Sequence, residues 1–132
     1  MPAPIAWDRI ADFIGRYLPT FEHLEVLLLA ARSPERYVSA AEAAHALGID
    51  AVAAGRALED LAAANLLDVK LLDDVRYRLR SQAAAAADIA ELQTAYAAQR
   101  VRVVNEIMAG RSRRIRDFAD AFRIHNDEEP NG

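Results

Sequence analysis

Apolar residues at the start of the chain recur every three or four positions, which is the spacing of one face of an α-helix. One such stripe runs from Ile10 to Leu18 and stops at Pro19. A second runs from Phe21 to Arg32, with Thr20 placed as an N-cap that accepts a hydrogen bond from a free backbone N–H. The pattern therefore predicts two helices before residue 33.

Two short helices joined by a tight turn are predicted next. Ser39 and Glu42 have the spacing of a capping box, so a helix should begin directly after the serine. Gly48 can adopt the left-handed conformation that ends a helix, and Asp50 is placed to cap the following one, Ala51 to Asn65. This arrangement is typical of a helix-turn-helix.

After residue 65 the period of the apolar positions changes from about 3.6 to 2, which is typical of a strand with one face in solvent. One strand is expected at residues 67 to 72, and Asp73-Asp74 is expected to form the turn of a hairpin. The second strand alternates apolar Val75, Tyr77 and Leu79 with basic Arg76, Arg78 and Arg80.

The remaining pattern is helical. An Ala-rich stretch from Gln82 to Met108 predicts one long helix, interrupted by Gly110. A short amphipathic helix is expected to follow, up to Ile124. Residues 125 to 132 are polar and acidic, and we expect them to form a disordered tail.

These elements predict a mainly α fold with a small β-hairpin. The expected architecture is a winged helix-turn-helix core at residues 21 to 80, an N-terminal helix, and a C-terminal helical extension at residues 82 to 124. The chain has 132 residues, 53% of them hydrophobic and 27% charged. Because domains cluster at roughly 100 to 150 residues, we expect a single globular domain at residues 1 to 124.

Cysteine is absent, which excludes disulfides and thiolate chemistry and agrees with a reducing compartment. The N-terminus lacks the basic and apolar regions of a signal peptide. The longest apolar run, Val26 to Ala31, is far shorter than the roughly 20 residues of a membrane span. We therefore expect a cytoplasmic protein.

The net charge of −4 has the wrong sign for a protein that coats nucleic acid. Positive charge is nevertheless concentrated in two segments. Residues 70 to 80 carry a net charge of +2, and residues 100 to 124 carry +4, from seven arginines and three carboxylates. Residues 35 to 69, which include the helix-turn-helix, carry −4.

The segment from Ser39 to Leu67 resembles the helix-turn-helix of winged-helix bacterial regulators of the MarR and ArsR families. The matching features are the capping Ser39, the small Ala44 between the helices, the turn Leu47-Gly48-Ile49-Asp50, Val52, and Leu58-x-x-Leu61 running into Asn65-Leu66-Leu67. The stretch from Phe118 to Ile124 resembles the ends of small bacterial winged-helix proteins. The resemblance covers about residues 21 to 80 and implies a regulator, although winged helices also bind proteins.

Reading bases requires polar side chains at the exposed start of the second helix of the motif. That segment offers Ala51, Ala53, Ala54 and Ala57, and Arg56 is its only basic residue. Phosphate contacts could come from Arg76, Arg78 and Arg80 on the wing and from Arg111, Arg113 and Arg114. The simpler alternative is that these arginines are solvated surface charges or neutralise carbonyls at a helix end.

Catalytic chemistry has no support in the pattern. His23, His45 and His125 lack metal-ligand spacing, and the sequence has no glycine-rich phosphate loop and no nucleophile elbow. Metal-sensing branches of the families named above use Cys or His clusters, which this sequence lacks. We expect a non-enzymatic protein without a metal or other cofactor.

The Ala-rich helix is a candidate for self-association, because small side chains let two helices approach closely. We expect a homodimer with Ile89, Leu92, Tyr96 and Val103 in its interface; the alternative is that these residues fold back on the first helix of the same chain.

Two functional hypotheses follow. The first is a dimeric DNA-binding transcriptional regulator that holds the phosphate backbone of duplex DNA with its wing and C-terminal arginines. The second is a winged-helix module that binds another protein and no DNA, which the acidic, Ala-covered second helix favours.

Overall fold

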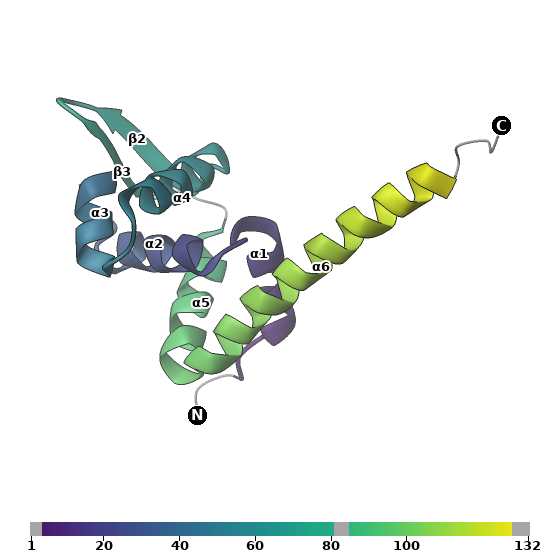
Figure 1. Ribbon diagram of the computed structural model, residues 1–132. Helices are drawn as coiled ribbons and strands as arrows, with labels where there is room; N and C mark the ends of the chain where they lie inside the picture. Colours follow the sequence, from purple (N-terminus) through teal and green to yellow (C-terminus); the bar gives the residue numbers. More distant parts are fainter. Residues whose placement is uncertain (1–3, 81–84, 128–132) are drawn as a thin grey trace.

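The computed structural model describes the backbone of residues 4 to 80 and 85 to 127 and the side chains of most of them. The elements follow in the order α1 (Trp7–Tyr17), α2 (Phe21–Arg32), β1 (Val38–Ser39), α3 (Ala40–Leu47), α4 (Ala51–Ala63), β2 (Leu67–Leu71), β3 (Val75–Leu79), α5 (Ala86–Ala98) and α6 (Arg100–Asp127). Figure 1 shows a compact body from which the second half of α6 projects.

The elements from α2 to β3 form a winged helix-turn-helix, which confirms the predicted fold class. Helices α3 and α4 meet at Gly48, whose φ of 67° and ψ of 34° are left-handed as expected. The Ser39 hydroxyl accepts a hydrogen bond from the N–H of Glu42, as the capping box predicts. Strands β2 and β3 form the predicted hairpin, which we call the wing, with Val69 opposite Tyr77.

The sheet has a third strand that the sequence pattern did not predict. Strand β1 pairs antiparallel with β3, and the strand order is β1-β3-β2. Only two residues form β1, so there is too little alternation in the sequence to reveal it. It joins the segment before α3 to the wing.

The prediction of one long helix from Gln82 to Met108 is wrong. Residues 82 to 84 lie outside the described residues, α5 ends at Ala98, and Gln99 leaves the helical conformation with φ −142° and ψ 67°. The break lets α6 turn back across α1, so that Val103 and Ile107 bury their side chains in the core instead of continuing into solvent.

Helix α6 passes through Gly110 without interruption and continues to Asp127, beyond the expected end at residue 124. A single glycine costs a helix only about 1 kcal/mol relative to alanine, which the packing of α6 on α1 offsets. Residues 128 to 132, the rest of the expected tail, lie outside the described residues.

Helices α1, α5 and α6 pack together beside the winged-helix core. Arg9 of α1 forms ion pairs with Asp88 and Glu91 of α5. The guanidinium of Arg102 on α6 lies 4.0 Å from the ring centroid of Trp7, a cation–π contact. These contacts fix the base of α6 on the body.

Candidate nucleic-acid interface

The second helix of the motif, α4, is held rigidly at its start. The Asp50 carboxylate accepts hydrogen bonds from the N–H groups of Val52 and Ala53, both at 3.1 Å. A histidine of α2 holds the second half of α4. The Nε2 of buried His23 lies 2.8 Å from the Asp60 carboxylate of α4. Nδ1 of the same ring lies 2.6 Å from the Thr20 hydroxyl. His23 is thus a structural link between α2 and α4.

The exposed face of α4 differs from the one expected. Ala54 and Ala57 are fully buried, so they cannot face a ligand. The side chains that α4 presents to solvent include those of Val52, which is 71% exposed, Arg56 and Glu59. No described side chain forms an ion pair with Arg56.

Two of the three wing arginines are held by carboxylates of the same chain. Arg76 lies 2.7 Å from the Glu42 carboxylate and 2.8 Å from that of Asp74. The hydrogen bond to Asp74 is the main reason that the pKa of Arg76 is raised. Arg80 donates to the Asn65 side chain at 3.3 Å and lies 3.8 Å from Asp68.

The third wing arginine has a different environment. The Arg78 guanidinium lies 4.6 Å from the ring centroid of Tyr37, and the Lys70 ammonium lies 5.3 Å from the same centroid. Neither cation pairs with a carboxylate among the described side chains. These two cations on one aromatic ring are therefore available for an anion.

The two faces of the wing have opposite character. Residues directly opposite each other on paired strands share a face, so Lys70 lies on the side of Arg76, and Val69 lies on the side of buried Tyr77. Tyr77 is buried in the core and β2 packs against α4, so this apolar side faces the body. Burial, and secondarily the charge of Glu59 on α4, raises the pKa of Tyr77. The outer part of this apolar side consists of the exposed residues Val69, Leu71 and Val75.

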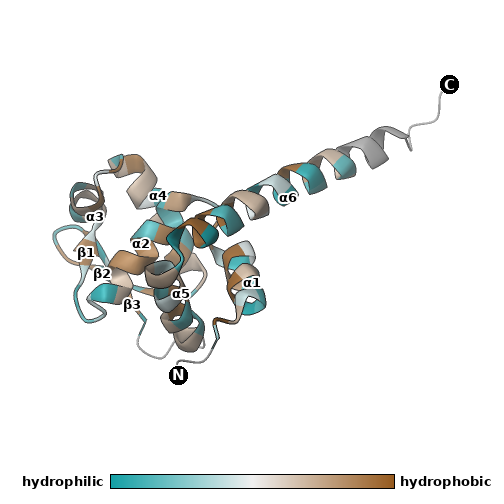
Figure 2. Ribbon diagram, turned by 90° about the horizontal axis from the view of Figure 1, so that it is seen from below, coloured by the Kyte–Doolittle hydropathy of each residue, from teal (hydrophilic) through white to brown (hydrophobic). Residues whose placement is uncertain are grey.

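The C-terminal arginines are far from the wing. Figures 1 and 2 both show the wing and the projecting part of α6 at opposite ends of the molecule. Arg114 donates a hydrogen bond to the Gly15 carbonyl, which ties α6 to α1. Arg111 and Arg113 are exposed, and the hollow beside Arg113 is also lined by Asp8, Asp12 and Asp117.

The predicted interface residues lie mainly in the core of the single chain. Ile89, Leu92 and Val103 are buried, so their side chains are not available to a second copy. Only Tyr96 is partly exposed. Their burial agrees with the alternative, in which these residues pack within their own chain, because the break at residue 99 folds α5 and α6 together against α1.

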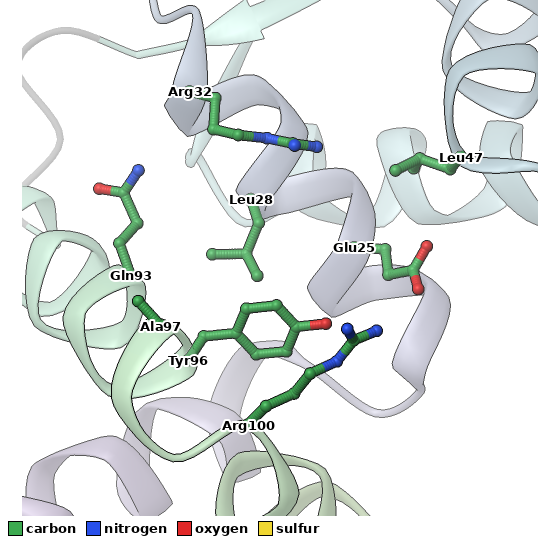
Figure 3. Close-up of a pocket in the computed structure, with 8 residues that line it drawn as sticks. All are labelled: Glu25, Leu28, Arg32, Leu47, Gln93, Tyr96, Ala97 and Arg100. Carbon is green, nitrogen blue, oxygen red and sulfur yellow. The ribbon is translucent and has the colours of Figure 1, made fainter.

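Tyr96 instead borders a hollow of about 400 Å³ between α2, the end of α3, α5 and the start of α6 (Figure 3). Leu28 and the Tyr96 ring contribute to its apolar part, and the Arg100 guanidinium lies 5.2 Å from the ring centroid. Its other lining residues are Glu25, Arg32, Leu47, Gln93 and Ala97. None of these lining residues is a serine, cysteine or histidine.

Residues 4 to 80 and 85 to 127 contain neither a metal-binding cluster nor a membrane-spanning helix. No group of three or more His, Asp or Glu residues lies close enough together there to hold a metal ion. No helix in that part of the chain combines the length and the apolar character that a membrane crossing requires.

Comparison with known proteins gave one structural likeness. No protein-family model matches the chain, and neither does any curated protein. Among solved structures, a protein described as a "possible transcriptional regulator" from Methanosarcina mazei Go1 aligns with a TM-score of 0.48 and 15% identity, over 95% of this chain and 89% of that one. A likeness at this level assigns no function.

Proposed function

We propose that the chain is a dimeric winged-helix transcriptional regulator that binds duplex DNA through α4 and the wing. The observation that carries the proposal is the position of α4: it is the second helix of a helix-turn-helix, one face is open to solvent, and its Arg56 is not paired with any described carboxylate. In helix-turn-helix regulators this helix enters the major groove.

Three cations are assigned to the DNA. Arg56 extends from the exposed face of α4. Lys70 and Arg78 come from the basic side of the wing, which is the side away from α4, and no described carboxylate forms an ion pair with them. Arg76 and Arg80 are assigned to holding the wing, because their guanidinium groups already bind Glu42, Asp74, Asn65 and Asp68. Arg111 and Arg113 lie at the other end of the molecule and are left out of this contact.

The assignment predicts weak discrimination between sequences. Arg56 is the one exposed α4 residue suited to a bidentate contact with guanine, and neighbouring Val52 reaches at most a thymine methyl. Affinity should therefore come mainly from phosphate contacts.

A salt titration of binding to random-sequence duplex DNA tests the proposal. Each phosphate contact contributes about −0.9 to the slope of log affinity on log salt, so three contacts predict roughly −3 per protomer. Arg56→Ala and Arg78→Ala should each make the slope shallower by about 1. Arg76→Ala is the matched control on the same strand and should change it little; absence of binding even at low salt would overturn the proposal.

A second candidate is a protein-binding module, and the apolar side of the wing favours it. Val69, Leu71 and Val75 are too apolar for a phosphate-binding surface. Under this candidate the salt titration finds no DNA binding, and Leu71→Ser improves solubility while abolishing capture of the partner protein.

A further inference from the structure

Helix α6 carries an apolar stripe that is largely exposed in the part of the chain that the structure describes, with Val104 as its one half-buried member. Its members recur at alternating intervals of three and four, with Arg111 as the one interruption: Val101, Val104, Met108, Ile115 and Phe118. Phe118 is 74% exposed, Ile115 63% and Met108 55%. We call these residues the α6 stripe. The neighbouring face of the helix, with Val103 and Ile107, is buried against the body.

This spacing is that of a coiled-coil seam, in which apolar residues at every 3.5 positions face a partner helix. Three of the residues that flank the outer stripe are small, namely Ser112, Ala119 and Ala121, and they allow close approach, while the fourth is Arg114. Figure 1 shows this half of α6 standing clear of the body, and Figure 2 shows brown apolar segments between teal ones along it. The helix is therefore accessible from a side on which no other element packs.

We propose that a second copy of this chain covers the stripe, with the two α6 helices antiparallel and Ile115 of each copy opposite Phe118 of the other. In this register residue 112 lies opposite residue 121 and residue 116 opposite 117. The inference deepens the proposed function, of which a dimer is part, because it names the surface that forms the dimer.

Charge selects both the partner and the direction. Residues 112 to 116 carry three arginines and no carboxylate, and residues 117 to 121 carry Asp117 and Asp120 and no cation. The antiparallel register lays each basic segment over the acidic segment of the other copy. A parallel pair would lay three arginines on three arginines, which like-charge repulsion disfavours.

The antiparallel arrangement also separates the two bodies. Each body lies at the N-terminal end of its own α6, so they come to opposite ends of the pair and do not collide. Met108, Ile115 and Phe118 of two copies bury on the order of 1,000 Å², at the lower limit of specific interfaces. We therefore expect a dissociation constant on the order of 1 to 100 µM.

Analytical ultracentrifugation across this concentration range tests the dimer. Phe118→Asp should leave only monomer at about 500 µM. Val101→Asp is the matched control. Val101 belongs to the same stripe and is equally exposed, at 73%, but in the proposed register it lies outside the part of α6 that the second α6 covers. A monomeric wild-type chain, or dimerisation of the Phe118→Asp variant, would overturn the proposal.

Disulfide cross-linking tests the direction, since the natural chain has no cysteine. A mixture of the Ser112→Cys and Ala119→Cys proteins should form a mixed disulfide dimer, because these positions flank the stripe on the same side and the antiparallel register places them within two residues of each other along the pair. Efficient cross-linking of Ser112→Cys with itself would instead indicate a parallel pair and refute the register.

The two proposals fail separately. Phe118→Asp should abolish the dimer and leave the salt slope per protomer unchanged. Arg56→Ala should weaken DNA binding and leave sedimentation unchanged.

Discussion

Replacing Gly48 by alanine isolates the corner of the helix-turn-helix. An added Cβ would meet no atom within 4 Å, so packing contributes nothing to the effect. The cost comes from the left-handed backbone, with φ of 67°, and is roughly 1 to 2 kcal/mol for an L-residue. Reduced freedom of the unfolded chain offsets about 0.4 to 1 kcal/mol of this cost. We expect the free energy of unfolding to fall by about 1 kcal/mol.

Gly15→Ala is the matched control. Gly15 lies within helix α1, its φ is not in the left-handed region, and a Cβ there also meets nothing within 4 Å. Alanine is favoured over glycine in a helix by about 1 kcal/mol, so this variant should be more stable. The same chemical change thus has opposite signs at the two positions, and the two variants should differ by about 2 kcal/mol.

Urea denaturation monitored by far-UV circular dichroism measures both variants. The midpoints should move in opposite directions from that of the parent chain, with the slopes unchanged. Equal stabilisation by both substitutions would mean that residue 48 is not left-handed, and the tight corner between α3 and α4 would be refuted.

Three further predictions concern the core and its links. Leu92→Ala should lower the free energy of unfolding by about 2 to 5 kcal/mol, because Leu92 is fully buried. If Leu92 instead lay in an interface with a second copy, the variant would lose the dimer in a sedimentation experiment. His23→Leu should cost about 1 to 3 kcal/mol in the same denaturation assay, since it leaves Thr20 and Asp60 without their shared partner; an unchanged midpoint would contradict this link. At Asn65, whose φ is 66°, the glycine variant should be about 1 kcal/mol more stable to unfolding than the alanine variant. A higher melting temperature for the alanine variant would exclude a left-handed residue at the end of α4.

The local elements of the core could be read from the sequence. The caps at Thr20, Ser39 and Asp50 and the glycine at position 48 act on backbone groups a few residues away, so their effect depends little on the rest of the fold. The alternation around Tyr77 likewise records which strand face is buried. These signals are local, and the structure agrees with them.

The tertiary structure decided the features that depend on distant partners. The helix break at Gln99 is set by the packing of α6 on α1, and the partners of Arg76 and Arg80 come from other elements. Ile89, Leu92 and Val103 have the same helical spacing whether they face the core or a second copy. A single sequence fixes the period of its apolar faces, but the chain's own folding determines which of those faces remains uncovered.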